Sequence, residues 1–257
     1  MQIIDTHTHI YLPEFKEDIA EVIHRAKQVG VSHFCLPNID EESIAPIVQL
    51  CTQFPGIMSP MWGIHPCSVK ADWKLLWEKL QKTIVDHPPI AIGEIGMDLY
   101  WDQSFQKEQE EALICQCNFA IQHNLPVAIH VRNAFPELFD VFDKHLDTTK
   151  LRGVFHCFSG DEAILEKALS YPHFLLGIGG VVTFKNGGLN TLIPKIPMQR
   201  IILETDAPYL APKPFRGKRN EPSYLSYILE EIAVHSGKST EEIAQQSTLN
   251  AQQLFGI

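Results

Sequence analysis

The 257-residue sequence has no hydrophobic run close to the ~20 residues that a membrane-spanning helix needs. Its first residues lack the basic segment and apolar stretch of a secretory signal peptide. The six cysteines show no paired spacing of a disulfide framework or metal clip, which is typical of reduced thiols. These absences predict a cytoplasmic protein that neither crosses a membrane nor needs disulfide bonds to fold.

Positive charge is scarce in this chain. It has 21 Lys and Arg residues against 31 Asp and Glu residues, and a formal net charge of −10. A protein that coats long nucleic acids with its whole surface is normally basic, so that class is disfavoured. A local positive site is still compatible with the sequence, because four basic residues cluster without an intervening acid: Lys213, Arg216, Lys218 and Arg219.

Short apolar or β-branched segments alternate with amphipathic helical patterns along the chain. Eight segments predict strands: Ile3–Thr6, His33–Leu36, Met58–Gly63, Ile90–Gly93, Val127–Ile129, Gly153–Phe155, Phe174–Ile178 and Ile201–Thr205. Between them, apolar residues recur with helical spacing, as in the segment 15–29. Alternating strands and helices indicate a parallel sheet with helices packed outside, and eight such units favour a closed barrel.

A dinucleotide-binding open sheet fits the sequence less well. The glycines at 177–180 follow the seventh predicted strand and lack the third glycine of a Gly-x-Gly-x-x-Gly motif. Residues 221–236 form the eighth helical pattern, and 239–242 have the sequence of a capping box that starts a last helix toward Phe255. We therefore predict an α/β fold with one domain over 1–257, a single (β/α)8 TIM barrel with an extra C-terminal helix.

Residues of metal-ligand type follow five of the predicted strands. They are His7 and His9 after the first, Glu94 after the fourth, His130 after the fifth, His156 after the sixth and Asp206 after the eighth. The carboxyl ends of barrel strands meet at one mouth, where active sites lie. Residues two apart on a strand point the same way, so His7 and His9 would face one point. An empty cluster of buried polar groups would be costly to desolvate, so the pattern predicts a metal site.

Two metal ions explain this number of ligands better than one, since a tetrahedral ion with an open position takes three protein ligands. Glu94 is the natural bridge, because a carboxylate offers two oxygens. We expect one ion among His7, His9, Glu94 and Asp206, and the other among Glu94, His130 and His156. Two divalent cations beside two carboxylates leave a charge of about +2, which favours an anionic substrate such as a phosphodiester.

Six motifs mark these strand ends. They are Asp5-Thr-His-Thr-His9, Gly63-Ile-His-Pro66, Gly93-Glu-Ile-Gly-Met-Asp98, His130-Val-Arg132, His156-Cys-Phe-Ser-Gly160 and Glu204-Thr-Asp-Ala-Pro-Tyr209. In this order they resemble the signature set of the TatD-like deoxyribonuclease family. The stretches 216–222 and 250–255 resemble that family's block after the last strand and its C-terminal helix, so the resemblance covers essentially the whole chain. Departures at Met97, Val131 and Asn133 concern substrate contacts.

The resemblance implies a divalent-metal-dependent hydrolase of the metallo-dependent hydrolase superfamily that cleaves DNA phosphodiester bonds. It implies metal-ligand roles for the six residues that the strand-end pattern selects: His7, His9, Glu94, His130, His156 and Asp206. We expect two divalent ions as cofactors and single-stranded DNA or DNA ends as the substrate, cleaved by an exonuclease. We expect that the protein does not bind a membrane and has no obligate protein partner.

Expected roles follow for individual side chains. Glu94 and Asp206 are the expected catalytic carboxylates, and Asp206 is the candidate to take a proton from a metal-activated water. Asp5 and Glu204 share side-chain direction with ligands and are expected to orient them. The candidates for substrate contact, through phosphate or, for the tyrosine, a stacked base, are His65, Arg132, Tyr209, Lys218 and Arg219.

Other functions stay open at this point. An amidohydrolase or phosphodiesterase acting on a small molecule could use the same site, although many such enzymes bridge their metals with a carboxylated lysine and strand four offers Glu94. The polymerase and histidinol phosphatase family usually ends with Asp-x-His, where this chain has Asp206-Ala-Pro. A barrel that only binds nucleic acid would be expected to lose ligands. The sequence does not choose among Zn, Mn and Mg, DNA and RNA, exonuclease and endonuclease, or oligomeric states.

Overall fold

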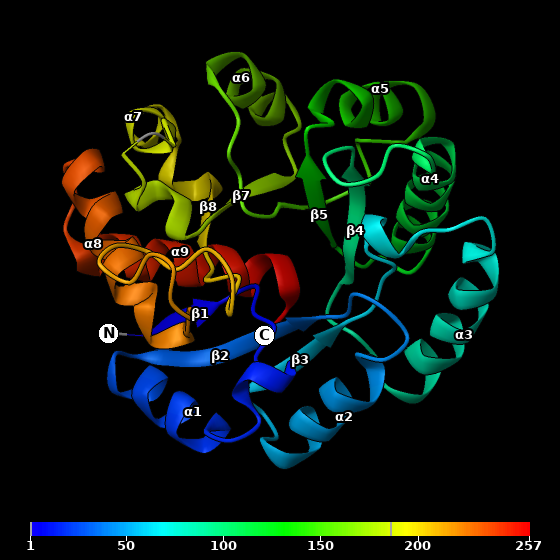
Figure 1. The fold of residues 1–257 in the computed structure, drawn as a ribbon. Coiled ribbons are helices and arrows are strands. Elements are labelled where there is room, and N and C mark those ends of the chain that lie inside the picture. The colour runs from blue at the N-terminus through cyan, green and yellow to red at the C-terminus, as the bar shows by residue number, and fades with distance from the viewer. Residues whose placement is uncertain (1, 186) are drawn as a thin grey trace.

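The computed structural model describes residues 2–185 and 187–257, which form a ring of parallel strands surrounded by helices (Figure 1). The strands are β1 (Ile3–Asp5), β2 (Val31–Pro37), β3 (Met58–Met61), β4 (Ile92–Asp98), β5 (Val127–Arg132), β6 (Gly153–Phe155), β7 (Phe174–Ile178) and β8 (Ile201–Leu203). The helices are α1 (Ile19–Gln28), α2 (Ile44–Gln53), α3 (Trp73–Asp86), α4 (Gln106–Gln122), α5 (Phe135–His145), α6 (Glu162–Ser170), α7 (Leu189–Leu192), α8 (Leu225–Ser236) and α9 (Thr240–Phe255).

The ring closes at two seams between hydrogen-bonded sheets. One sheet has the order β1-β2-β3 and the other runs from β4 to β8, with all neighbours parallel. Met61 and Ala91 form a parallel bridge between β3 and the start of β4, and Thr6 N donates to Leu203 O at 3.0 Å between β1 and β8. The α/β TIM barrel with an extra C-terminal helix is confirmed; that residues 1–257 make one domain stays a prediction.

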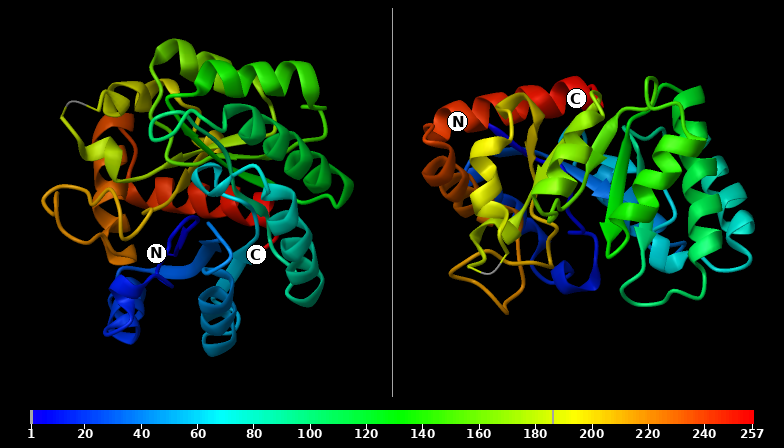
Figure 2. Two further views of the ribbon diagram at one scale, coloured as in Figure 1. Left: turned by 45° about the vertical axis from the view of Figure 1, so that its right-hand side comes forward. Right: turned by 90° about the horizontal axis from the view of Figure 1, so that it is seen from above.

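The last helix has a structural task at the amino-terminal ends of the strands. Ala251, Leu254 and Phe255 of α9 pack on strand residues such as Ile4 and Ile202, in a small buried cluster that we call the floor. Figure 2 shows α9 lying across one end of the barrel. The predicted capping box is present at its start: Ser239 Oγ accepts from Glu242 N at 3.2 Å, and Glu242 Oε2 accepts from Ser239 N at 2.9 Å.

Only β6 and β7 have the predicted bounds, and the differences at β1, β4 and β5 change where the site residues lie. β4 continues through Asp98, and β5 continues through Arg132, because these segments pair residue by residue as far as Asp98 and Arg132. Glu94 therefore lies inside β4 and does not follow it. β1 ends at Asp5, so His7 and His9 lie in the segment after the strand, which bends at His7. Hydrogen bonds hold that segment in place, because Thr8 N donates to Cys35 O on β2 at 3.1 Å and His9 N donates to Ala207 O at 2.7 Å.

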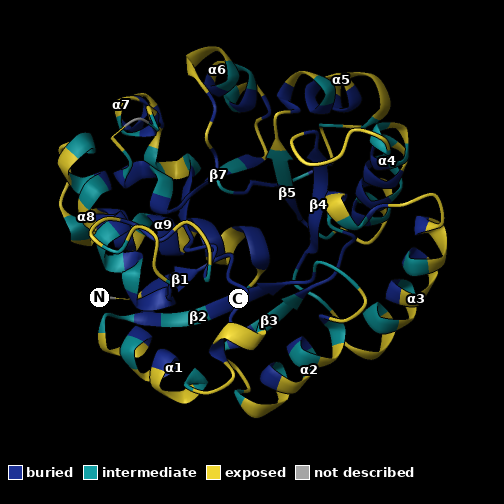
Figure 3. Ribbon diagram, in the orientation of Figure 1, coloured by how far each residue is buried: buried dark blue, intermediate teal, exposed yellow. Residues whose placement is uncertain are grey.

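Burial follows the layers of the barrel, with the strands buried and the outward faces of the helices exposed (Figure 3). In α1 the buried residues are Val22, Ile23 and Ala26, as its helical spacing predicts. In the part of the chain that the structure describes, no helix is both long and apolar enough to cross a membrane.

Candidate metal centre

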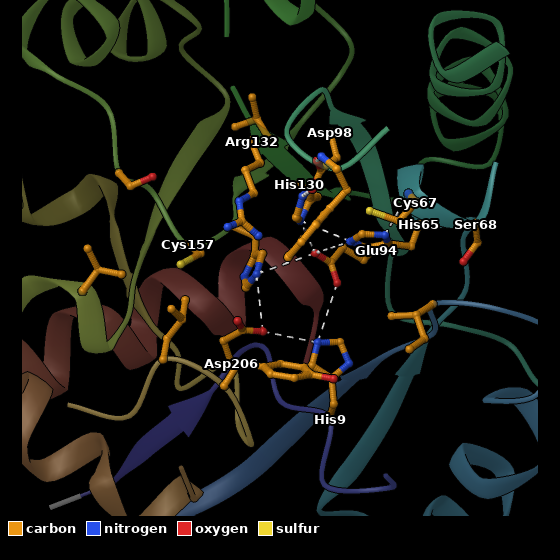
Figure 4. A pocket seen from close by; sticks show the side chains of 18 residues that line it. His9, His65, Cys67, Ser68, Glu94, Asp98, His130, Arg132, Cys157 and Asp206 are labelled. Carbon is orange, nitrogen blue, oxygen red and sulfur yellow. Dashed lines mark hydrogen bonds and ion pairs between the residues drawn. The ribbon is translucent and has the colours of Figure 1, made fainter. Parts of the chain in front are cut away.

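Glu94 occupies the middle of the barrel mouth, and its side chain is 3 % exposed. Its Oε2 atom faces the first-strand histidines, 3.2 Å from His7 Nε2 and 3.7 Å from His9 Nε2. Asp206 Oδ1 completes this side of the mouth, 3.3 Å from His9 Nε2 (Figure 4). The same oxygen lies 3.9 Å from His7 Nε2. The backbone of Asp206 is left-handed, with φ of 57°, and its N–H donates to His7 O at 2.9 Å. Together these contacts place one carboxylate oxygen from each acid beside the same pair of imidazoles.

The other oxygen of Glu94 faces a different set of histidines. Glu94 Oε1 lies 2.8 Å from His130 Nδ1, 3.5 Å from His65 Nε2 and 3.7 Å from His156 Nε2. His156 Nε2 also lies 3.6 Å from Asp206 Oδ1, so this imidazole stands between the two sides of the mouth. The two oxygens of one buried carboxylate thus serve two separate groups of nitrogen donors.

The donor atoms fit divalent ions in chemistry and spacing. Two ligands each ~2.1 Å from a tetrahedral ion lie ~3.4 Å apart, close to the separations above. Three groups at the mouth have their donor atoms within 4.8 Å of one another: His7 with His9 and Glu94, His7 with His156 and Asp206, and His65 with Glu94 and His130. The expected partnership of His130 with His156 is not among these groups. His65, expected at the substrate, instead stands next to Glu94 and His130.

Tyr11 fixes the tautomer of His9. Its hydroxyl donates to Pro37 O at 2.7 Å and lies 2.8 Å from His9 Nδ1. Because the single phenol proton goes to the carbonyl, the hydroxyl must accept a proton from Nδ1–H. The Nε2 atom of His9 then carries a lone pair directed at Glu94 and Asp206, which is the form that binds a metal.

Glu204 forms a buried ion pair with His156. The fully buried Glu204 places Oε1 2.9 Å from His156 Nδ1, which leaves Nε2 to face the mouth. Glycine at position 177 provides room for this carboxylate, because a Cβ atom there would lie 2.2 Å from Glu204 Oε2. The position expected for Glu204, beside His156, therefore depends on Gly177 of the neighbouring strand β7.

Asp98 orients His130 from the end of β4. Its buried carboxylate places Oδ2 3.0 Å from His130 Nε2, while His130 Nδ1 faces Glu94. Burial opposes the charge of Asp98, but its hydrogen bond with His130 and the nearby charge of that ring lower its pKa to about 2. An ionised Asp98 accepts from Nε2–H, so Nδ1, which faces Glu94, is the nitrogen that would give up its proton to bind a metal ion.

Asp5 acts through the backbone. Its carboxylate accepts from Thr205 N at 2.9 Å and from Thr205 Oγ1 at 2.6 Å, and more weakly from His7 N at 3.4 Å. It therefore ties the segment of His7 to the residue before Asp206, without touching a ligand side chain. Burial raises the pKa of Asp5 to about 8, against the hydrogen bonds from Thr205.

The ionisable groups of the mouth perturb one another strongly. Burial and the nearby His156 lower the pKa of His7 to about 4, so its imidazole is neutral and available as a ligand at neutral pH. Burial opposes the charged form of His156, but the charges of Glu204 and Glu94 raise its pKa to about 10. Burial likewise opposes ionisation of Glu94, yet the surrounding histidines lower its pKa well below its usual range. Without metal ions, the protonated ring of His156 gives this centre positive charge. Bound metal cations would take the place of that charge.

The expected substrate residues divide into two groups. His65, Arg132 and Tyr209 line a cavity of about 720 Å³ that also contains Glu94 and Asp206. Lys218 and Arg219 do not line it. Arg219 donates to Asp18 Oδ1 at 2.8 Å and to Asp18 Oδ2 at 2.7 Å, so the basic loop is folded back onto the start of α1. The charge of Arg219 is therefore paired with a carboxylate outside the cavity, and its role as a substrate contact stays a prediction.

Sequence reasoning missed Tyr11, and it left Asp98 without a role. Asp98 ends the quoted strand-four motif, and the boundary error hid it, since β4 was expected to stop five residues earlier. Tyr11 lies two residues beyond His9 in a turn, and no local pattern in the sequence signals its contact with His9. Trp101, which also lines the cavity, follows Asp98 in the same loop.

Comparison with known proteins agrees with this geometry. The family model described as TatD related DNase matches residues 4–256. The chain is 34% identical to an uncharacterized metal-dependent hydrolase, YabD, of Bacillus subtilis, over 99% of both chains. It is 30% identical to the 3'-5' ssDNA/RNA exonuclease TatD of Yersinia pseudotuberculosis, over 99% of this chain and 100% of that one.

A solved structure is similar over the same length. The TatD homologue YJJV from Escherichia coli superposes with a TM-score of 0.91 at 29% identity, covering 99% of this chain and 98% of that one. Since the family model spans nearly the whole chain, the assignment rests on more than a shared fold. The chain belongs to the TatD-related DNase family and is a metal-dependent hydrolase that acts on ester bonds.

Proposed function

We propose that the protein is a deoxyribonuclease with two divalent ions at the barrel mouth, and that it removes nucleotides from single-stranded DNA ends. The proposal rests on the way the two carboxylate oxygens of Glu94 face different histidines. Oε2 faces His7 and His9, while Oε1 faces His130 and His65. A carboxylate in that position can bridge two ions. His156 and Asp206 complete the ligand set of six that we propose, with His65 as a further candidate.

Bound divalent ions would supply Lewis-acid stabilisation of the phosphate charge and an activated water. Asp206 is the proposed proton acceptor. Its Oδ1 faces imidazoles, while Oδ2 makes no ion pair or hydrogen bond with another residue of the described chain and belongs to a side chain that lines the cavity. Burial opposes ionisation, but His9 and His156 lower the pKa of Asp206, so Oδ2 is unprotonated at neutral pH and can take a proton.

A nucleic acid substrate is supported by the mouth and by the relatives. The relatives from Yersinia and Erwinia are named 3'-5' ssDNA/RNA exonuclease, which supports the same substrate class and polarity here. Arg132 brings a guanidinium to the cavity wall, where it can contact phosphate oxygens. The exposed Lys218 lies outside the cavity and would meet only a more distant part of a strand.

Hydrolysis of end-labelled DNA tests the proposal. Single-stranded oligonucleotides labelled at either end would be incubated with the wild type, Asp206→Ala and Asp140→Ala, with Mg, Mn and Zn in separate reactions. Asp140→Ala is the matched control, because it removes an exposed carboxylate on α5 that pairs only with Lys144. We expect a metal-dependent ladder that shortens the strand from its 3' end, retained in the control and lost in Asp206→Ala.

The opposite outcome is equally clear. If the metal-loaded wild type cleaves no strand of DNA or RNA, the nuclease proposal fails, and a small phosphodiester or amide becomes the better substrate for this site. Internal cuts in a circular single strand would replace the exonuclease by an endonuclease. Equal cleavage by wild type and Asp206→Ala would remove Asp206 from the reaction.

A further inference from the structure

Exposed aromatic side chains lie at the cavity, although the other tryptophans of the chain are buried. Trp101 is 70% exposed, whereas the other three of the four tryptophans are at most 5% exposed. Tyr100 beside it is 51% exposed, and both follow β4 in the loop toward α4. Trp101 lines the cavity, and a large aromatic ring left in water on the wall of an active-site cavity is typical of a binding surface.

The loop that carries these rings is fixed to the metal centre. Asp98 Oδ1 accepts from Tyr100 N at 3.0 Å and from Trp101 N at 3.4 Å. The other oxygen of the same carboxylate holds His130. One buried side chain therefore sets the position of a candidate ligand and of the aromatic pair, so that the distance between them cannot change freely.

Arg132 adds a cation to this surface. Its guanidinium carbon lies 3.8 Å from the centre of the Tyr100 ring and 5.2 Å from the centre of the Trp101 ring. The contact follows from the sheet, because Arg132 pairs with Asp98 between β5 and β4. Within residues 2–185 and 187–257, no carboxylate forms an ion pair with Arg132, which leaves its charge available to an anion. An arginine stacked on a ring still presents its N–H edge to phosphate.

We propose that Trp101, Tyr100 and Arg132 form a stacking platform for an unpaired nucleobase next to the phosphate that is cleaved. This inference rests on the proposed function, since it places that phosphate at the metal centre. Trp101 would stack on the base, and Arg132 would neutralise the adjoining phosphate. Tyr209, 49% exposed on the loop after β8, lies four strands away around the ring and offers a second ring across the mouth.

The platform explains selection of single strands. A base must leave its neighbours in a duplex before it can stack on a protein ring, whereas every base of a single strand has a free face. The platform reads no hydrogen-bond pattern, so it accepts any base. It also distinguishes polynucleotides from small phosphodiesters, which lack a base at the required distance from the phosphate.

Fluorescence gives a test that does not depend on turnover. A phosphorothioate-linked tetrathymidylate would be titrated into the metal-loaded wild type, Trp101→Leu and Val234→Ala. Val234 is the control, because it is an exposed apolar residue on α8 outside the cavity. We expect the ligand to quench emission in the wild type and in Val234→Ala, and to leave emission unchanged in Trp101→Leu, whose remaining tryptophans are buried. Ligand binding without quenching in the wild type would overturn the platform.

Kinetics with a modified substrate completes the test. We expect Trp101→Leu to raise KM for a single-stranded oligonucleotide about 10-fold with little change in kcat, and Trp101→Phe to restore most of the loss. With an oligonucleotide whose terminal positions are abasic, the gap between wild type and Trp101→Leu should close. A gap of the same size on the abasic strand would overturn base stacking. Failure of the wild type to cleave either strand would instead reject the proposed nuclease function itself.

Discussion

At the floor of the barrel, Ile4 and Ala128 lie buried against α9, whereas at the mouth, His7 and His130 from the same chain segments surround a buried carboxylate. Each polar residue lies only two or three positions further along the chain than its apolar counterpart. The floor is filled by apolar side chains that pack against one another. The mouth is filled by histidine and carboxylate side chains that need an ion-pair, hydrogen-bond or metal partner. Stability is therefore expected to come from one end of each strand and chemistry from the other.

The electrostatics of the two ends differ accordingly. The floor cluster contains apolar residues and no charged side chain among its described members. At the mouth, burial opposes the charges of Glu94, Asp206 and His156, and each keeps its charge because neighbouring ionisable groups offset the effect of burial. Mutations at the mouth should lower activity more than stability, and mutations at the floor should do the reverse.

The largest effect is expected for Asp206→Asn. The substitution keeps the size of the side chain, and asparagine tolerates the left-handed backbone at this position. Loss of the proton acceptor and of one metal ligand should lower kcat/KM on single-stranded DNA about 10³-fold, or about 4 kcal/mol. The urea midpoint of the metal-free protein should not fall. A parallel loss of stability and activity would erase the difference between mouth and floor.

Phe255→Ala tests the other end. Phe255 is 6% exposed in the floor cluster, so its truncation leaves a cavity under the strands. We expect the free energy of unfolding to fall by about 3 kcal/mol, measured by urea denaturation. At a temperature where the variant is fully folded, kcat/KM should stay within twofold of the wild type. A large loss of activity in the folded variant would mean that the floor controls the mouth.

Gly177→Ala tests the orientation of His156. The new Cβ atom would lie 2.2 Å from Glu204 Oε2, so the carboxylate must move away from its place beside His156 Nδ1. We expect metal affinity to fall about 30-fold, measured by competition with a chromogenic chelator. Gly179→Ala is the matched control, since its nearest neighbour would lie 3.5 Å away. Equal affinities of the two variants would contradict the role of Glu204.

Tyr11→Phe tests the tautomer of His9. The variant keeps the ring but removes the hydroxyl that accepts from His9 Nδ1. His9 can then carry its proton on Nε2, so metal affinity should fall about 10-fold. Isothermal titration of the metal-free protein would measure the change. Unchanged affinity, together with a reduced free energy of unfolding, would assign Tyr11 to packing at Pro37 alone.

The smallest effect is expected for Arg219→Met. Arg219 lowers the pKa of Asp18, so the pair stabilises the fold above the unfolded pKa of that carboxyl and loses its effect as the pH falls through the lowered pKa. We expect a loss of about 0.5–1 kcal/mol at pH 7 in urea denaturation, and none in strong acid. KM for single-stranded DNA should change less than twofold. A tenfold rise in KM would instead support Arg219 as a substrate contact.

The sequence was sufficient for the features that depend on local pattern. Alternating strand and helix periodicity predicts the eight strands, and the Ser239 capping box predicts the start of α9. The six candidate ligands could be chosen because parallel strands bring their carboxyl ends together, whatever the details of the loops. Those residues all meet at the mouth, although the individual metal-ligand roles stay predictions.

Features that depend on distant contacts could not be predicted. Arg219 pairs with Asp18, 201 positions earlier in the chain, and no local pattern signals that contact. The extension of β4 to Asp98 depends on its pairing with β5, which also places Arg132 over Tyr100. The accepting role of Tyr11 depends on a carbonyl of β2, 26 positions away.

The number of bound metal ions tests the central claim most directly. Metal-free wild type and Glu94→Gln would be dialysed to equilibrium against Mn or Zn, and bound metal would be measured by mass spectrometry. We predict two ions per chain in the wild type and a reduced number in Glu94→Gln, because an amide offers only one oxygen to bridge the two histidine groups. A single ion in the saturated wild type, or two ions held equally well by Glu94→Gln, would contradict a centre bridged by Glu94.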